Sequence, residues 1–251
     1  MKLTGHKVVI TGGGSGIGAG LAKAFIERGN KVVITGRREQ VLREMVGRLP
    51  GLETFVMDVA KETDIQKLFA LVAKEHPTTD VIINNAGIML WPDFSRPETL
   101  GENLFDEIEI NLKGLIRMTA VFLPLLLKQP EATLINVSSG LAYVPLASTP
   151  IYCATKAAVH SFSDSLRHQL RKTHVQVLEL APPRVETNLG ETAGRPEGKY
   201  PGMGLEAFIA LTMKALESGK SELPIGQAKF LRFGSRLMPS FLFKKLNPSK
   251  A

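Results

Sequence analysis

Tyr152 and Lys156 stand four residues apart in a stretch with helical periodicity, a spacing that brings both side chains to one face of a helix. A free phenol has a pKa of about 10 and is a poor base at neutral pH, whereas a neighbouring ammonium favours the phenolate. The pair suits acid–base chemistry on an alcohol or a carbonyl, although by itself it could equally be the surface of an ordinary helix. Ser139, at the end of an expected strand, is placed to hold the reacting oxygen against Tyr152. Ser138 is the competing candidate, but successive strand residues point to opposite faces and the spacing favours Ser139.

A glycine-rich turn near the start of the chain predicts a phosphate-binding site. The expected strand ending at Thr11 runs directly into this turn and then into a helix. Glycines allow a tight turn and a close approach to a pyrophosphate, and the helix N-terminus offers free N–H groups and the positive end of its dipole. A bare structural turn is the alternative, but both flanks have the expected character. The cofactor-binding residues predicted here are Gly12, Ser15, Gly16, Ile17 and Gly18.

The end of the second expected strand indicates which dinucleotide the site prefers. An NAD enzyme usually places an acidic residue there to accept a hydrogen bond from the ribose 2′-hydroxyl. Gly36 stands at that position, and Arg37 and Arg38 follow. Guanidinium groups bind a 2′-phosphate through paired charge-assisted hydrogen bonds. Solvated charges at the start of a helix are the alternative, and Glu39 is the rival acid, but the pattern favours NADP(H) over NAD(H).

Short β-branched runs alternate with longer helical patterns along the chain, which is typical of a parallel sheet covered by helices on both faces. The expected strands are Lys7–Thr11, Lys31–Thr35, Thr54–Met57, Val81–Asn84, Thr133–Val137, Val175–Leu180 and a short one near Leu223–Ile225. The expected helices are Ile17–Arg28, Glu39–Gly47, Thr63–Glu75, Asn103–Leu127, Tyr152–Lys172 and Leu205–Glu217. We predict an α/β fold, a Rossmann-type doubly wound parallel sheet of about seven strands. One domain spans residues 1–251, with a substrate loop and helix over 187–225 and a basic amphipathic tail over 226–251.

Composition excludes several other classes of protein. Hydrophobic residues make up 44% and charged residues 22% of the 251 positions, the ordinary globular range. The net charge of +7 is concentrated after residue 220, where six basic residues face one acidic residue, and no nucleic-acid-binding motif accompanies it. No apolar run approaches the roughly 20 residues of a membrane-spanning helix. The single cysteine suits a reducing compartment, so a cytoplasmic location is expected.

Taken together, these motifs resemble the short-chain dehydrogenase/reductase family. The resemblance runs from about Lys2 to Thr187 and rests on the order and spacing of the Thr-Gly-x-x-x-Gly-Ile-Gly turn, Asn-Asn-Ala-Gly after the fourth strand, and the Ser, Tyr and Lys above. The run after the fifth strand is similar to a bacterial branch labelled DltE-like. The family implies hydride transfer between NADP(H) and a carbonyl or alcohol, with Tyr152 as acid/base and Ser139 orienting the oxygen. Lys156 would tune Tyr152 and hold the nicotinamide ribose, and Asn111 would position a water in a proton relay.

The same resemblance implies further contacts with the cofactor. Asp58 would contact the adenine side, although it could equally be a helix cap, and Thr187 would bond the nicotinamide carboxamide. Where the family often has Pro-Gly this chain has Pro182-Pro183, which removes one N–H donor. A homodimer or homotetramer built on the long helices is implied as well. The remaining cofactor-binding residues carried over from the family are Val59, Asn84, Ala86, Gly87 and Pro182.

The tail and the substrate leave alternatives open. Phe230, Phe233, Leu237 and Phe241 recur at helical spacing beside a stripe of cations. We expect them to pack on the domain or cover the substrate site, in preference to a subunit contact or a membrane surface. The apolar character of this region suggests an apolar substrate. No metal site is expected, because the five histidines show no pairing at metal-ligand spacing. The rival function is an NADP-binding regulatory or scaffolding protein without turnover.

Overall fold

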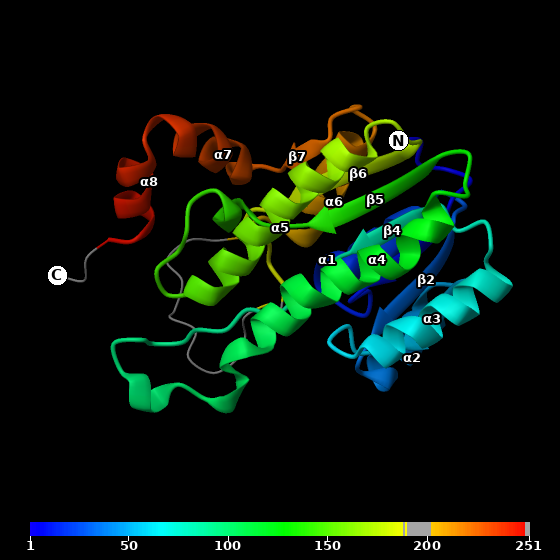
Figure 1. Cartoon of the computed structure of the whole chain (residues 1–251), viewed down its shortest axis with the longest axis horizontal. Coiled ribbons are helices and arrows are strands. Elements are labelled where there is room, and N and C mark those ends of the chain that lie inside the picture. Colours follow the sequence, from blue (N-terminus) through cyan, green and yellow to red (C-terminus); the bar gives the residue numbers. More distant parts are fainter. Residues whose placement is uncertain (188, 190–201, 249–251) are drawn as a thin grey trace.

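Seven parallel strands form one twisted sheet in the computed structural model, which describes residues 1–187, 189 and 202–248 (Figure 1). The strand order is β3-β2-β1-β4-β5-β6-β7, and every neighbouring pair is parallel. The predicted Rossmann-type doubly wound sheet is therefore confirmed. The strands are β1 Lys7–Thr11, β2 Lys31–Gly36, β3 Leu52–Val56, β4 Val81–Asn84, β5 Ala132–Val137, β6 Val175–Ala181 and β7 Glu222–Pro224.

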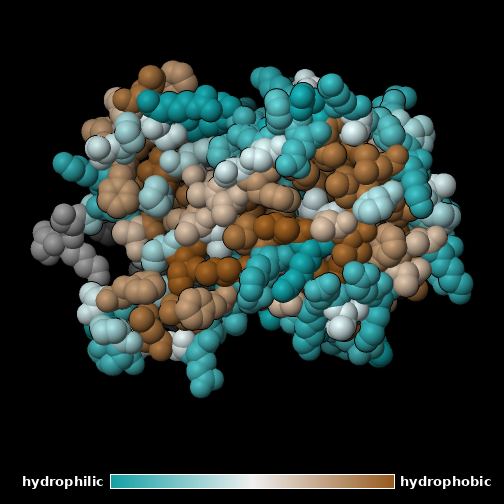
Figure 2. Space-filling view, viewed as in Figure 1, coloured by the Kyte–Doolittle hydropathy of each residue, from teal (hydrophilic) through white to brown (hydrophobic). Residues whose placement is uncertain are grey.

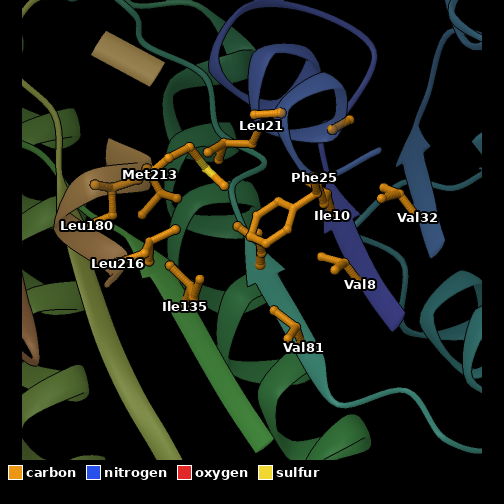
Figure 3. Close-up of a cluster of buried hydrophobic side chains, with 14 of the residues drawn as sticks. Val8, Ile10, Leu21, Phe25, Val32, Val81, Ile135, Leu180, Met213 and Leu216 are labelled. Carbon is orange, nitrogen blue, oxygen red and sulfur yellow. The ribbon is translucent and has the colours of Figure 1, made fainter. Parts of the chain in front are cut away.

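Helices cover both faces of this sheet, because successive strand residues alternate between two apolar cores. Val8 and Ile10 of β1 join one core, whereas Val9 between them joins the other. The first core also takes side chains from three helices, and Figure 3 shows Phe25 and Met213 from two of them over the strands. The helices on this face are α1 Gly16–Ile26, α2 Glu39–Arg48 and α6 Leu205–Leu216. Those on the other face are α3 Glu62–Glu75, α4 Leu115–Leu126 and α5 Pro150–Leu170.

The strand order places the predicted motifs at one edge. From β1 the chain winds outward through β2 and β3, then returns to β4 on the other side of β1. Open α/β sheets bind their ligands at this reversal, outside the carboxyl ends of the strands. The glycine turn follows β1, the Asn-Asn-Ala-Gly segment follows β4, and Ser139 lies just beyond β5.

The expected single helix Asn103–Leu127 is wrong in detail. A 3₁₀ turn spans Glu102–Phe105, a π-helix spans Ile108–Gly114, and only then does α4 begin. The wider π turns are rare in proteins, and those that do occur are frequently found at functional sites. Gly114 permits close packing here, since a β-carbon on it would lie 2.9 Å from the carbonyl oxygen of Val59.

The tail forms two helices, α7 Gln227–Leu237 and α8 Pro239–Leu246, at one end of the molecule (Figure 1). The expectation that the stripe of Phe230, Phe233, Leu237 and Phe241 packs on the domain is wrong. Other residues of the tail make the inner contacts, since Ala228 packs on Gly140 and the buried Leu242 packs on Gly234. The phenylalanine stripe lies on another face, and the exposed fractions are 54% for Phe230, 67% for Phe233, 63% for Leu237 and 58% for Phe241.

Within the described residues, no helix is long and apolar enough to cross a bilayer.

Candidate active site

The glycine turn has the backbone that its sequence predicts. Gly12 and Gly16 have φ values of 66° and 53°, a region of backbone conformation that residues other than glycine rarely adopt. A β-carbon on Gly18 would lie 2.3 Å from the carbonyl oxygen of Gly12, so the turn can close only around glycine. Ser15 is the N-cap of α1, but its side chain accepts no capping hydrogen bond within the described residues. The first N–H groups of α1 can therefore receive an anion, and Ile17 packs beneath them against the core.

Thr11 joins this turn to the segment after β4. Its hydroxyl oxygen accepts hydrogen bonds from the N–H groups of Asn85 and Ala86, both at 3.0 Å. The Asn85 side chain donates back to the carbonyl oxygens of Thr11 and Gly12, at 2.9 and 3.2 Å. Sequence reasoning assigned no role to Thr11 or Asn85, although both lie within the motifs that it identified.

The arginines after β2 reach toward the glycine turn. Arg37 and Arg38 are exposed, and Nη2 of Arg38 lies 3.4 Å from Oγ of Ser15. Glu39, the rival acid, instead accepts a 2.6 Å hydrogen bond from Arg43 one turn along α2. The geometry thus assigns Glu39 to the helix surface and leaves cations beside the phosphate turn.

Asp58 and Val59 shape the turn after β3. Oδ1 of Asp58 accepts from the N–H of Ala60 at 3.0 Å, while the Asp58 N–H donates to Asp64. Lys61, not Asp58, is the N-cap of α3, so the helix-cap alternative is wrong and Asp58 organises a tight turn. Val59 is buried against Gly114.

Tyr152 and Lys156 lie together on the inward face of α5. Their exposed fractions are 6% and 4%, and Nζ of Lys156 stands 5.6 Å from the centre of the Tyr152 ring. The ammonium also donates to the carbonyl oxygen of Val137 at 2.9 Å. Burial lowers the pKa of Lys156 to about 8, against an opposing effect from Glu107. Burial raises the pKa of Tyr152, and a hydrogen bond with Ser139 partly offsets this, so the phenol is protonated at neutral pH.

Ser139 faces Tyr152, as the strand alternation predicts. Its Oγ accepts from the N–H of Leu141 at 3.1 Å and shares the hydrogen bond with the phenol. Ser138 points the other way and bonds the buried carboxylate of Glu179. The choice of Ser139 over Ser138 therefore agrees with the geometry.

Asn111 lies in the π-helix and is completely buried. Its Oδ1 accepts from the N–H of Ile88 at 2.8 Å, and its Nδ2 donates to the Ile88 carbonyl at 2.9 Å and to Oγ1 of Thr155 at 3.3 Å. The side chain thus links the segment after β4 to α5, at the residue that precedes Lys156.

Glu107 is a further site residue that sequence reasoning missed. It is completely buried one helical turn before Asn111, and Oε1 accepts from the N–H of Leu90 at 2.9 Å. Burial raises its pKa to about 7, against opposing effects of that bond and of Lys156. An acidic residue four positions ahead of Asn111 was the available signal.

The other predicted cofactor residues lie around the same edge. Asn84 donates to Thr119 at 3.1 Å and to Asn136 at 3.0 Å, which ties β4 to α4 and β5. Thr187 packs on Gly16, where a β-carbon would lie 3.3 Å away. The Pro182 carbonyl accepts from the N–H of Gly140 at 2.8 Å. Residues 188 and 190–201 of the predicted substrate region lie outside the described residues.

Three histidines, His6, His76 and His160, pair with carboxylates in the described residues, contrary to the expectation from the sequence, and His160 meets two of them. Ligating atoms of His160, Asp164 and Glu179 all lie within 4.8 Å of one another. Nδ1 of His160 lies 2.7 Å from Oε2 of Glu179, whose other oxygen pairs with Ser138. Both oxygens of Glu179 thus have protein partners, so the group serves as a structural network. Glu179 comes from β6, which spacing along α5 alone could not reveal.

Comparison with known proteins places this geometry in context. A family profile described as "short chain dehydrogenase" matches residues 6–198. The uncharacterized oxidoreductase DltE of Bacillus subtilis (strain 168) is 43% identical over 251 residues, covering 98% of each chain. A short chain dehydrogenase from Burkholderia cenocepacia J2315 in complex with NADP superposes with a TM-score of 0.84 at 26% identity, covering 98% of this chain and 99% of that one. A short chain dehydrogenase/reductase from Burkholderia phymatum in complex with NAD has the same TM-score at 23% identity, covering 100% and 99%, and shows the shared fold.

Proposed function

Because the chain belongs to the short-chain dehydrogenase/reductase family, and is thus an oxidoreductase that uses a nicotinamide cofactor, we propose that it transfers a hydride between NADP(H) and a carbonyl or secondary alcohol. Tyr152 is the general acid/base of this reaction. The observation that carries the proposal is the buried cluster of Tyr152, Lys156 and Ser139 beside the segment after β4. A surface helix would leave a Tyr-x-x-x-Lys pair in water, whereas here both side chains are almost fully removed from it.

The residues at the edge of the sheet fit a dinucleotide. The positive φ values of Gly12 and Gly16 and the open N-terminus of α1 provide a cradle for a pyrophosphate. Further contacts are assigned to Asp58, Val59, Asn84, Ala86, Gly87, Pro182 and Thr187. The bound cofactor supplies or accepts the hydride, and the protein supplies position and the proton.

Each side chain of the cluster has a distinct task. Ser139 donates to the substrate oxygen and holds it near the Tyr152 hydroxyl. Tyr152, protonated at neutral pH because burial raises its pKa, gives its proton to the oxygen during reduction and takes it back during oxidation. Lys156 holds its ammonium near the ring, where it stabilises the phenolate that forms. Asn111 fixes the segment after β4, and through it the floor of the site.

The preference for NADP(H) rests on the residues after β2. Structures of this fold hold either cofactor, NADP in one neighbour and NAD in another, so the fold alone does not decide. Here Gly36 takes the place of an acid, and Arg38 reaches Ser15 in the phosphate turn. Arginine there attracts a 2′-phosphate that a carboxylate would repel.

An apolar substrate is supported by the surroundings of the segment that follows Ser139. A hollow of about 420 Å³ lies beside this segment, and it is lined by Tyr143, Val144, Pro145, Pro239, Ser240, Phe243 and Lys244. Most of these side chains are apolar, which suits the carbon skeleton of a hydrophobic carbonyl compound.

A homodimer or homotetramer is part of the proposal. Figure 2 shows apolar side chains across the middle of the face where α4 and α5 lie, and Ile116 and Leu127 of this region are 37% and 39% exposed. Exposed apolar area of this kind is typical of subunit contacts.

The test is NADPH oxidation with a panel of aldehydes and ketones, using Tyr152→Phe as the matched variant. We expect turnover by the wild type, and a loss of about 1,000-fold or more in the variant with NADPH binding unchanged by fluorescence. Binding without turnover across a broad panel would instead favour a regulatory or scaffolding protein. Equal turnover by the variant would remove Tyr152 as the acid/base.

A further inference from the structure

A carboxylate that the proposed mechanism does not use lies buried beside the catalytic cluster. Glu107 has an exposed fraction of 0% and precedes the π-helix that carries Asn111. Buried carboxylates in proteins are nearly always paired or hydrogen-bonded at both oxygens. Here Oε1 accepts from the N–H of Leu90 at 2.9 Å, but Oε2 is buried with no hydrogen-bond partner among the residues that the structure describes.

Anchoring Leu90 does not require an acid. A glutamine in the same place would accept the same N–H bond through its amide oxygen and would avoid burying a charge. Asn111, one turn later, holds Ile88 in this way with an uncharged amide. The negative charge of Glu107 must therefore act on something other than the backbone of this segment.

The π-helix that follows Glu107 packs on α5, and the charged and titratable groups that interact with Glu107 in the described residues come from α5. Lys156 is the cation, and Tyr152 and Cys153 are the groups whose ionisation the carboxylate disfavours. Lys156 lies 4% exposed, so its ammonium is poorly solvated and burial favours the neutral amine. Glu107 opposes that loss of charge by Coulomb attraction, which is strong where water is excluded.

We propose that Glu107 is a positioning residue whose carboxylate keeps the buried Lys156 in its ammonium form. This rests on the proposed function, in which the ammonium supports proton transfer at Tyr152. Without Glu107 the lysine loses its proton at a lower pH, and the alkaline limit of turnover moves with it. At lower pH, where Lys156 is protonated in either case, the charge of Glu107 matters little.

The test compares Glu107→Gln with Glu107→Asp. The glutamine keeps the shape and the bond to Leu90, so a merely structural role predicts an unchanged pH profile. We expect the alkaline limb of kcat/KM to move down by about one pH unit, roughly a tenfold loss above the limb, with activity at lower pH within about threefold of wild type. The aspartate keeps the charge, so we expect the limb to return toward its wild-type position.

A second readout does not depend on turnover. With lysine labelled at Cε, the Lys156 resonance is assigned by its loss in Lys156→Met, and its titration is followed by NMR in each variant. A lower midpoint in Glu107→Gln supports the proposal even if no substrate is found. An unchanged midpoint overturns it, whatever the outcome of the activity panel.

The exposed face of α7 and α8 carries an independent inference. Phe230, Phe233 and Phe241 are each more than half exposed, at 54%, 67% and 58%. No acidic residue occurs after Glu222. Four cations of these helices make no ion pair within the described residues, and they are Lys229, Arg236, Lys244 and Lys245. Figure 2 shows hydrophobic and hydrophilic side chains side by side at this end of the molecule.

The positive charge of this face distinguishes between the two partners that could cover it, a second copy of the chain and a lipid surface. A symmetric contact with a second copy would set the same patch against itself and bring like charges together, with no acid to neutralise them. An anionic lipid surface complements the cations and accepts the phenylalanines between its headgroups. We infer that α7 and α8 dock on anionic membrane surfaces.

The test is cosedimentation of the full chain with vesicles of phosphatidylcholine, with and without phosphatidylglycerol, at low and high salt. We expect binding only to the anionic vesicles, weakened by salt, and a loss of about tenfold or more in Phe230→Ser/Phe233→Ser. Phe105→Ser, which removes an exposed phenylalanine elsewhere (64% exposed), is the matched control. Absence of binding at low salt overturns the inference, as does a dimer in solution that Phe230→Ser/Phe233→Ser dissociates.

Discussion

Gly87 lies against Asn111 so closely that a β-carbon on Gly87 would stand 3.2 Å from the Oδ1 atom of Asn111 and 3.6 Å from Nζ of Lys156. The same Oδ1 atom accepts the N–H of Ile88. The absence of a side chain at position 87 therefore allows the segment after β4 to rest on the buried amide and the ammonium together. The φ angle of Gly87 is not positive. Glycine is therefore needed here for the space that it leaves and not for an unusual backbone conformation.

Gly87→Ala should lower turnover without unfolding the protein. The added methyl group displaces Asn111 by a few tenths of an ångström and weakens its bonds to Ile88, and small misplacements in a catalytic site cost roughly tenfold or more in rate. Steady-state kinetics with any substrate from the panel measures this loss. Gly47→Ala, where a β-carbon would meet nothing within 4 Å, serves as the control and should leave kcat unchanged. Equal kcat in the two variants would contradict the role given to this contact.

Arg38→Ala should reduce the preference for NADP(H). Losing a charge-assisted hydrogen bond to the 2′-phosphate costs about 1.5–3 kcal/mol, so kcat/KM with NADPH should fall about 10- to 100-fold. The value with NADH should change little, since that cofactor has no phosphate at this position. Arg43→Ala removes an exposed arginine that pairs with Glu39 and should affect neither cofactor. An equal loss of kcat/KM with both cofactors would show that Arg38 does not recognise the 2′-phosphate.

Thr11→Val should destabilise the fold although it keeps the shape of the side chain. The N–H groups of Asn85 and Ala86 lose their acceptor, and unsatisfied groups of this kind cost about 1–3 kcal/mol. Chemical denaturation followed by circular dichroism measures the change. Thr63→Val, at an exposed position in α3, should stay within about 0.5 kcal/mol of wild type. An equal change in the free energy of unfolding for the two substitutions would show that the hydrogen bonds of the Thr11 hydroxyl do not stabilise the fold.

Removal of the His160 imidazole should destabilise the protein more in mildly acidic than in alkaline solution. The hydrogen bond to Glu179 raises the pKa of His160 above its usual value. A raised pKa in the folded state contributes stability that is fully present below the unfolded pKa of about 6.5 and is lost as the pH rises through the folded value. Urea denaturation of His160→Gln against wild type, at a pH below 6.5 and at one well above the raised value, measures the difference. His168→Gln, at an exposed position, should show no such dependence, and a constant effect of His160→Gln would contradict the linkage.

The parts of the site that could be predicted from the sequence are those whose residues lie close together along the chain. The pairing of Tyr152 with Lys156 and the choice of Ser139 follow from the period of one helix or one strand, and the glycine turn follows from its place between a strand and a helix. The parallel sheet of about seven strands follows from alternating strands and helices, since parallel neighbours need a crossover connection. These patterns depend on residues close together in the chain.

The parts that were missed depend on distant segments. Thr11 meets Asn85 across 74 positions, and Glu107 matters only because α5 brings Lys156 to it. The π-helix at Asn111 arises where a long helix must present its amide to Ile88 and pass closely over Val59, which helical periodicity alone does not encode. For the tail, periodicity predicted the phenylalanine stripe but not which side of the helices packs on the domain, because Ala228 and Leu242 make the inner contacts.

The end of α8 is fastened to the segment between Ser139 and Tyr152. The Asn247 side chain donates to the Pro145 carbonyl at 3.0 Å and accepts from the N–H of Ala147 at 2.6 Å. The position of the last helix is therefore coupled directly to the backbone that joins Ser139 to Tyr152. Under the proposed function, substitutions in the last helix would therefore alter the surroundings of the substrate without replacing Ser139 or Tyr152.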